Sequence, residues 1–297
     1  MNSRAACLLL LPVAACAAAP VRPAPTEADI SYGKHPHQVL DVYVPTKGAT
    51  PFPVLIWYGG LWQPSKNVPD PNRFLAQGIA LVAVEVRTMT DAVADKEKTP
   101  VRYVMEDAVR SVQYVRLNAS RWKLDPARVV VGGGSQGAQP ALYVGASPDQ
   151  ADARSADPVA RTSSRVSGVA AYRSQPTFDP KLMQAWVPGV KWGAPAFGCT
   201  FEESLKRRDE LMPEIRKWSS EHLLHAGSAP IYFENNWGLT QPEKVTEMDY
   251  KVHSPAWGVG YQRLARKAGV TCHLKYPGHP TEGFADIWDF ILKTLGP

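Results

Sequence analysis

Val129-Val130-Val131-Gly132-Gly133-Gly134-Ser135-Gln136-Gly137-Ala138 is the stretch around which the chain is organised. Within it, residues 133–137 fit the pattern G-x-S-x-G. The β-branched run before the glycines is typical of a buried strand, and a helical pattern begins at Ala138. This pattern indicates a reactive serine where it joins a strand to a helix, as it does here.

The residue types in this stretch follow from the geometry of a sharp turn. Gly133 and Gly137 allow the strand and the helix to pass close to Ser135 without a Cβ clash. A helix that starts directly after the serine points its first amides at any developing oxyanion. The sequence therefore predicts Ser135 as a nucleophile. The alternative is a glycine-rich turn with an incidental serine.

Strand patterns alternate with helical patterns along the rest of the chain. The predicted strands cover residues 30–33, 39–44, 52–57, 80–86, 128–131, 166–172, 229–234 and 270–276. The predicted helices cover residues 71–78, 102–122, 138–146, 202–217, 261–268 and 285–295, and residues 91–100 are expected to form a loop. This alternation predicts an α/β fold with a mostly parallel central sheet and helices on both faces.

Composition sets the broad class of the protein. The 297 residues are 44% hydrophobic and 21% charged, which is ordinary for a globular protein with a full core. The formal net charge is +5, but acidic and basic residues are interleaved. Without a basic stripe or a nucleic-acid motif, the sequence argues against a nucleic-acid partner.

The first residues resemble an export signal rather than part of the fold. A short basic start is followed by an apolar run at residues 5–15 that is too short for a stable membrane span. Val13-Ala14-Ala15-Cys16 resembles a bacterial lipobox, which predicts a signal over 1–16, lipidation of Cys16 and an Ala- and Pro-rich tether over 17–27. Ordinary signal cleavage near residues 17–19, giving a soluble exported protein, is the alternative.

The mature chain offers few ligands for a metal. Cys199 and Cys272 remain after the signal, either as a disulfide or as free buried thiols. His35 and His37 flank Pro36 and are expected in a turn rather than as a metal pair. The sequence therefore predicts no metal and no cofactor.

Several segments outside the serine motif carry a family resemblance. They are Leu40-Asp41-Val42-Tyr43-Val44-Pro45, Tyr58-Gly59-Gly60-Leu61-Trp62, Asp107-Ala108-Val109-Arg110 and Asp125-Pro126-Ala127-Arg128-Val129. With these segments, residues 28–297 resemble an α/β-hydrolase of the esterase and lipase type. The nearest resemblance is to exported bacterial carboxylesterases of the feruloyl- or acetyl-esterase kind.

The Gly-Gly turn after the strand at 52–57 is expected to form part of an oxyanion hole. The resemblance places the backbone amides of Gly60, Leu61 and Gln136 around the oxyanion. In the family, the corresponding stretch usually reads His-Gly-Gly-Gly. In this sequence Tyr58 replaces the histidine and Leu61 replaces the third glycine. A plain β-turn is the alternative.

The fold family places a catalytic acid and then a histidine after the serine in chain order. Asp249 in Asp-Tyr-Lys-Val resembles the acid loop of the family, and Glu234 and Glu247 are the alternatives. The predicted role of this acid is to orient the histidine and to stabilise its imidazolium form. A helix-capping aspartate is the other interpretation.

The predicted general base is His279, because no other histidine follows the last predicted strand. The family usually has its histidine two residues before a phenylalanine, and Glu282 occupies that position here. His273 lies within the strand and is expected to pack.

An insertion at residues 173–227 interrupts the alternation of strands and helices. The family often carries a cap here, and a cap would select substrates through its aromatic residues. A surface insertion whose tryptophans only pack is the alternative. The aromatic residues of the insertion are Trp186, Trp192, Phe197, Phe201 and Trp218.

These features predict a serine hydrolase that cleaves short-chain or aromatic carboxylic esters, free or attached to a polysaccharide. The predicted contact with the membrane is through a lipid on Cys16 alone. A non-catalytic tethered binding protein and a serine peptidase are the alternatives, because one fold hosts many functions.

Overall fold

The computed structural model describes residues 21–296. The strands are β1 (Glu27–Ser31), β2 (Val39–Tyr43), β3 (Phe52–Tyr58), β4 (Ala80–Val84), β5 (Leu124–Gly134), β6 (Gly168–Tyr172), β7 (Ile231–Glu234) and β8 (Cys272–Lys275). The α-helices are α1 (Asn72–Leu75), α2 (Met89–Ala94), α3 (Val101–Leu117), α4 (Ala138–Ala146), α5 (Pro180–Trp186), α6 (Phe201–Lys206), α7 (Arg208–Trp218), α8 (Glu247–Val252), α9 (Ala256–Lys267) and α10 (Ile287–Leu295). Short 3₁₀ turns cover Ala119–Trp122, Ser135–Gly137, Ala194–Phe197 and Ser220–His222.

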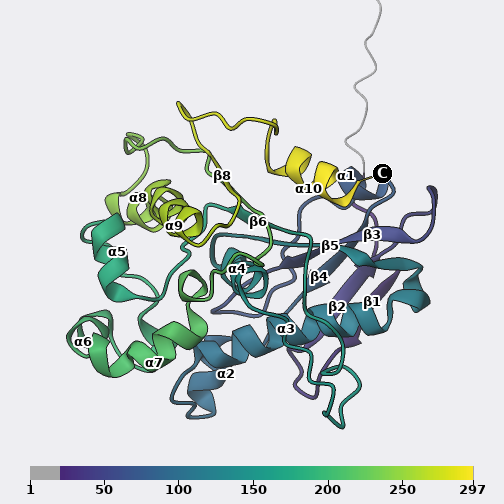
Figure 1. The fold of residues 1–297 in the computed structure, drawn as a ribbon, viewed down its shortest axis with the longest axis horizontal. Coiled ribbons are helices and arrows are strands. Elements are labelled where there is room, and N and C mark those ends of the chain that lie inside the picture. Colours follow the sequence, from purple (N-terminus) through teal and green to yellow (C-terminus); the bar gives the residue numbers. More distant parts are fainter. Residues whose placement is uncertain (1–20, 297) are drawn as a thin grey trace, which may run out of the picture.

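The strands form one eight-stranded sheet in the order β1-β2-β4-β3-β5-β6-β7-β8 (Figure 1). The β1–β2 and β2–β4 pairs are antiparallel, and every later pair is parallel. The predicted α/β class with a mostly parallel sheet is confirmed. Because the parallel strands end at the same edge, the loops that follow β3, β5, β6 and β7 lie together there.

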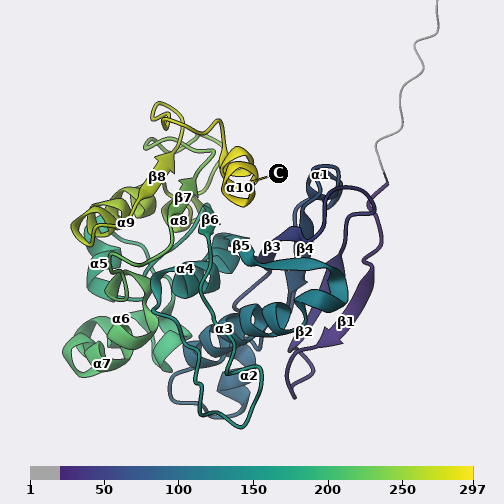
Figure 2. The same cartoon turned by 45° about the vertical axis from the view of Figure 1, so that its right-hand side comes forward.

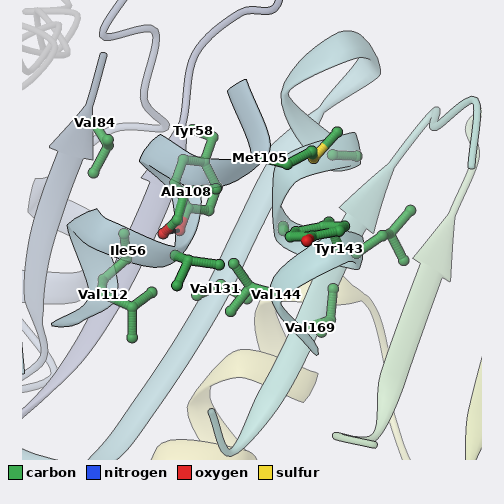
Figure 3. Close-up of a cluster of buried hydrophobic side chains, with 14 of the residues drawn as sticks. Ile56, Tyr58, Val84, Met105, Ala108, Val112, Val131, Tyr143, Val144 and Val169 are labelled. Atoms are coloured by element: carbon green, nitrogen blue, oxygen red, sulfur yellow. Dashed lines mark hydrogen bonds between the residues drawn. The ribbon is translucent and has the colours of Figure 1, made fainter. Parts of the chain in front are cut away.

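Alternate residues of the central strands face two different helical layers, as the period of a strand requires. Ile56 and Val131 belong to the core that α3 and α4 cover, where Val112 and Val144 pack (Figure 3). The opposite face of the same strands carries a second core, built on α10. Figures 1 and 2 show α10 and α3 on opposite sides of the sheet. Burial on both faces explains why these strands are almost wholly apolar.

Three predicted segments differ from the structure. Residues 91–100 were expected as a loop, but α2 forms because Thr88 and Asp91 make a capping box at its start. The helix predicted over 202–217 is two helices, α6 and α7, and Thr200 caps the first of them. Asp249 lies in a helix, α8, rather than in a loop.

The predicted signal, Cys16 and most of the predicted tether lie outside the described residues. Among residues 21–296, no helix is long and apolar enough to cross a membrane. Cys199 and Cys272 are both free thiols, so the disulfide alternative is not the state of this structure.

Candidate active site

Ser135 lies at the tip of a sharp turn between β5 and α4. Its φ of +51° is left-handed, a conformation that is costly for a residue with a side chain and is typical of a strained functional turn. A Cβ on Gly133 would meet the Gly137 carbonyl oxygen at 1.9 Å, and one on Gly137 would meet the Tyr58 carbonyl oxygen at 2.3 Å. The glycines on both sides of Ser135 are therefore required by close backbone packing.

A chain of two hydrogen-bonding contacts begins at Ser135. The Oγ atom of Ser135 lies 2.9 Å from Nε2 of His253. The Nδ1 atom of the same ring lies 2.8 Å from Oδ1 of Asp249. An ionised carboxylate only accepts hydrogen bonds, so Nδ1 carries the proton and Nε2 presents a lone pair to the serine. This is the arrangement of a nucleophile, a base and an orienting acid.

Asp249 and His253 come from one short helix. Thr246 caps α8 by accepting a hydrogen bond from the Asp249 amide, and His253 follows the last helical residue. Residues four apart lie on the same face of a helix, so the two side chains meet without help from another segment. The pattern Thr246-x-x-Asp249, followed by a histidine four residues later, is visible in the sequence and could have identified this pair.

Asn235, at the end of β7, holds His253 in place. Its Nδ2 atom donates to the His253 carbonyl oxygen at 2.7 Å, and its Oδ1 atom accepts from the Trp237 amide at 2.9 Å. The Trp237 ring stands nearly perpendicular to the His253 ring, at 6.1 Å between centroids. A catalytic acid was expected after β7. In its place, Asn235 holds the backbone of His253, and Trp237 contacts the ring of His253.

The structure does not bring His279, the base predicted from the sequence, to Ser135. His279 follows β8 in a tight turn in which its amide donates to the Tyr276 carbonyl oxygen at 2.8 Å. Its ring stacks on the Tyr276 ring at 4.9 Å, and its Nδ1 lies 3.1 Å from the Leu274 carbonyl oxygen. The turn directs His279 back onto its own strand, whereas His253 reaches Ser135.

The other ionisable candidates have different partners. The Glu234 carboxylate accepts from the Ile287 amide at 2.6 Å, and burial raises its pKa. Glu247 pairs with Lys251 at 2.6 Å across one turn of α8. His273 packs edge-on against Phe284, as expected, and burial lowers its pKa. Of the acids considered from the sequence, only Asp249 meets the histidine beside Ser135.

The loop after β3 was predicted to supply oxyanion donors. The amides of Gly60 and Gln136 donate to no protein acceptor within residues 21–296. The Leu61 amide instead donates to Oε1 of Gln136 at 2.9 Å, and the Trp62 amide donates to the same oxygen at 3.1 Å. The Leu61 amide is therefore already hydrogen-bonded in this structure, and its role as an oxyanion donor stays a prediction.

Two departures from the family pattern have packing explanations. Tyr58 is fully buried, and its hydroxyl donates to the Ala108 carbonyl oxygen of α3 at 2.9 Å. The Leu61 side chain is also fully buried, and its carbonyl oxygen accepts from the Met89 amide of α2 at 2.8 Å. These contacts fix both ends of the Gly59-Gly60 turn against helices.

Comparisons with known proteins agree with this architecture. The family model BD-FAE matches residues 40–174, which include the loop after β3 and the Ser135 turn. A truncated carbohydrate esterase from gut microbiota superposes with a TM-score of 0.63 at 17% identity, over 93% of this chain and 99% of that one. The chain has an α/β-hydrolase fold.

Two further solved structures share the fold of this chain. A thermophilic esterase from Thermogutta terrifontis has a TM-score of 0.55 at 20% identity, over 86% of this chain and 82% of that one. Esterase 2 of the same organism, phosphonylated by sarin, has a TM-score of 0.52 at 20% identity, over 86% and 84% of the two chains.

The segment predicted as an insertion, residues 173–227, packs beside the loop after β3. Its Trp192 stacks on Phe178 at 5.5 Å and meets Trp62 edge-on at 6.4 Å. Trp62 directly follows the buried Leu61, so the insertion contacts the loop proposed to hold the oxyanion. Its function as a cap over the substrate stays a prediction.

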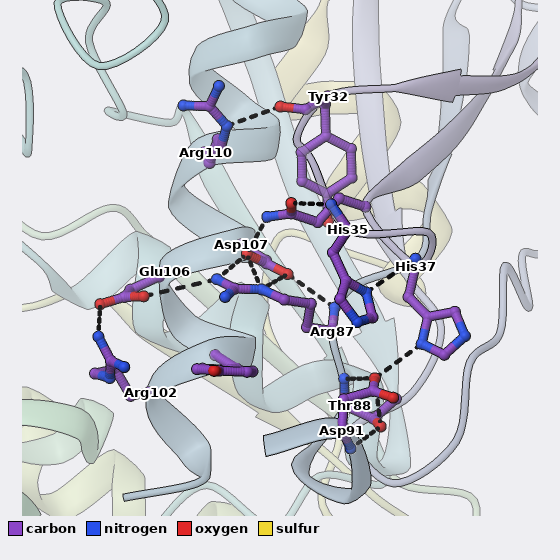
Figure 4. Close-up of polar contacts among 12 residues, drawn as sticks. Tyr32, His35, His37, Arg87, Thr88, Asp91, Arg102, Glu106, Asp107 and Arg110 are labelled. Carbon is purple, nitrogen blue, oxygen red and sulfur yellow. Dashed lines mark hydrogen bonds and ion pairs between the residues drawn. The ribbon is translucent and has the colours of Figure 1, made fainter. Parts of the chain in front are cut away.

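One group of possible metal ligands lies within residues 21–296, at His35, His37 and Asp91 (Figure 4). The His37 amide donates to Nδ1 of His35 at 3.1 Å, and Nδ1 of His37 lies 2.8 Å from the Asp91 carboxylate. The same carboxylate accepts from Thr88 at the start of α2. These contacts tie the expected turn at Pro36 to α2. The absence of a metal stays a prediction from the sequence.

Proposed function

We propose that this hydrolase is a serine carboxylesterase that works through an acyl-enzyme. The observation that carries the proposal is the contact chain from Ser135 through His253 to Asp249, at 2.9 and 2.8 Å. It brings a partly buried hydroxyl, a base and an orienting carboxylate together at the carboxyl ends of the parallel strands, where α/β folds bind ligands.

In the first half-reaction, Nε2 of His253 takes the proton from Ser135 while Oγ attacks the ester carbonyl carbon. Asp249 accepts a hydrogen bond from Nδ1 and stabilises the imidazolium that forms. The free amides of Gly60 and Gln136 are the proposed donors to the oxyanion, and the first amides of the turn at Ser135 are free because they lack an intrahelical partner. The imidazolium then protonates the leaving alkoxide.

In the second half-reaction, His253 takes a proton from water and the hydroxide attacks the acyl group on Ser135. The carbonyl oxygen again becomes an oxyanion beside Gly60 and Gln136. Collapse of this intermediate releases the carboxylic acid, and His253 returns its proton to Oγ. The chain's own residues balance every proton in this cycle, so the proposal needs no metal or cofactor.

The proposed substrates are short-chain or aromatic acyl esters, including esters attached to a carbohydrate. The similar structure of a carbohydrate esterase supports this class at the level of fold. The aromatic side chains next to the loop after β3, Trp62 and Trp192, offer apolar surface to an acyl or sugar group.

The test is hydrolysis of 4-nitrophenyl acetate and butyrate by the wild type and by Ser135→Ala, with fluorophosphonate labelling of both. We expect turnover and labelling for the wild type and neither for the variant. A folded wild type that is inert and unlabelled would contradict the proposal and favour the non-catalytic binding protein.

We also propose that the enzyme is exported and anchored through a lipid on Cys16. The support is the lipobox-like sequence alone. Metabolic labelling with palmitate tests the anchor, with Cys16→Ser as the matched variant. Label on the wild type alone supports it. Absence of label on both, with the protein found in the soluble exported fraction, indicates ordinary signal cleavage.

A further inference from the structure

Arg173 lies beside Ser135, the proposed nucleophile, at the carboxyl ends of the parallel strands. Gly134 pairs with Tyr172 in the parallel β5–β6 register, so Arg173 follows β6 as Ser135 follows β5. Neighbouring strands are separated by roughly 5 Å. The backbone of Arg173 is therefore placed next to the backbone of Ser135.

The backbone of Arg173 is held in an uncommon conformation. Its φ is +49°, in the left-handed region that favours glycine. Its amide donates to the Glu234 carbonyl oxygen at 2.9 Å, and its own carbonyl oxygen accepts from Nε2 of Gln175 at 3.0 Å. Nε2 of Gln175 also donates to the Val252 carbonyl oxygen at 2.8 Å, one residue before His253. The same side chain thus links Arg173 to the segment that carries the base.

The guanidinium of Arg173 stacks on an aromatic residue of the site. It lies 3.8 Å from the centroid of the Trp237 ring, and this ring stands edge-on to His253. Stacking uses the flat face of a guanidinium and leaves the N–H groups at its edge for a planar, bidentate acceptor. Trp237 therefore orients the cation and does not satisfy its donors.

These donors have no acceptor among the residues that the structure describes. Within residues 21–296, the Arg173 side chain makes no hydrogen bond and no ion pair, and its Nε is buried without a partner. The carboxylates that flank this edge are engaged elsewhere, Glu234 with the Ile287 amide and Asp249 with His253. A partly buried cation with one buried donor unused is costly unless an acceptor completes it.

We propose that Arg173 binds a carboxylate carried by the substrate, so that the natural ester is anionic close to its scissile carbonyl. Two kinds of ester share this chemistry: those whose alcohol part bears a carboxylate, as in an acylated uronic acid, and half-esters of a dicarboxylic acid. The inference rests on the proposed esterase function and adds to it the charge of the substrate.

Two pairs of model esters distinguish a carboxylate in the alcohol part from a carboxylate in the acyl part. 4-Acetoxybenzoate and methyl 4-acetoxybenzoate differ by a charge in the alcohol part. Mono-4-nitrophenyl adipate and 4-nitrophenyl hexanoate differ by a charge in the acyl part. For each pair, the measured quantity is the ratio of kcat/KM for the anionic ester to kcat/KM for the neutral ester.

We expect the wild type to favour the anionic member of one pair, and Arg173→Met to lower that ratio about tenfold or more, as loss of a charge-assisted bidentate pair implies. Arg173→Lys keeps the charge without the planar fork and should fall between the two. Arg263→Met, on the exposed face of α9, is the matched control for loss of one positive charge and should keep the wild-type ratio.

A second measurement needs no variant at Arg173. Raising the ionic strength should lower the wild-type ratio, because screening weakens a charge pair that solvent can reach. Turnover of the neutral esters, with equal ratios in the wild type and Arg173→Met and no dependence on salt, would overturn the inference and leave the esterase proposal standing. Absence of turnover of every ester, together with absence of fluorophosphonate labelling, would overturn both.

Discussion

His253 lies one helical turn after Asp249, and the two side chains meet at 2.8 Å at the end of α8. Their alignment is thus built into a single helix, and only the contact with Ser135 depends on the rest of the fold. A capped helix of six residues followed by the histidine supplies both the base and the acid of the proposed mechanism. The chain still keeps the order serine, acid, histidine.

The identity of the base can be tested by paired variants. His253→Ala should lower kcat for 4-nitrophenyl acetate by about 1000-fold or more, because the imidazole in contact with Ser135 is removed. His279→Ala should change kcat by less than about threefold. Steady-state kinetics of both variants checks this, and the reverse result would show that the turn after β8 moves to the serine.

Asp249→Asn tests the orienting role of the acid. The asparagine keeps the amide that Thr246 accepts from, but it no longer requires a proton on Nδ1 of His253. We expect kcat to fall about 100- to 10,000-fold with the fold intact. Glu247→Gln removes the same charge from the same helix and should keep nearly full activity. Equal losses in the two variants would point to the stability of α8 instead.

Gln136→Met tests the link between the serine turn and the loop after β3. Methionine keeps the length of the side chain but loses the oxygen that accepts from the Leu61 and Trp62 amides. Two backbone donors then lack an acceptor and the loop relaxes. We expect kcat to fall about 10- to 100-fold with a smaller change in KM. Unchanged kcat, with an unchanged thermal midpoint, would mean that the packing of Leu61 suffices.

The insertion contains a buried acid that makes stability depend on pH. Glu221 accepts hydrogen bonds from Ser219 and Thr177, and burial raises its pKa from 4.5 to about 7. The pKa of His222 is also raised, chiefly by its contact with Asp179. Both groups hold their protons more tightly in the folded than in the unfolded chain. Between about pH 4.5 and 7 the folded state therefore binds more protons, and the free energy of unfolding falls as pH rises.

Glu221→Gln should flatten this dependence, because it removes the titrating group. We expect the wild type to lose stability between about pH 5 and about pH 8, and the variant to lose less by on the order of 1 kcal/mol. Urea unfolding at the two pH values measures both slopes. A wild-type stability that rises over this range would show that Glu221 is ionised in the fold without penalty.

Much of the fold could be predicted because its signals are local. β-Branched runs mark β3, β4 and β5, and the glycines around Ser135 specify a close turn that the structure requires. Asp249 could be found from its short motif. The sequence did not predict α2, because its capping box lies in a polar stretch that is typical of a loop.

Two features of the site depend on contacts between distant segments: the proposed base, and the hydrogen bond from the Leu61 amide to Gln136. His253 and Ser135 are 118 positions apart, and Leu61 is 75 positions from the side chain that occupies its amide. No periodicity of the sequence reports such distances. The usual chain order points to a histidine after the last strand, whereas the spacing of Asp249 and His253 is a helical one.

The loops after β7 and β8 line an open pocket of about 390 Å³, which Asn236, Tyr276 and Gly278 border. In the proposed mechanism His253 at the end of α8 transfers the proton, and the segment from Pro277 to Gly283 has no part in it. A Cβ on Gly278 or Gly283 would meet no atom within 4 Å, but φ is +85° at both positions, so a side chain there would strain the backbone. The loop between these two glycines can therefore diverge in length and composition during evolution, or accept a grafted segment, without disturbing the proposed catalytic machinery.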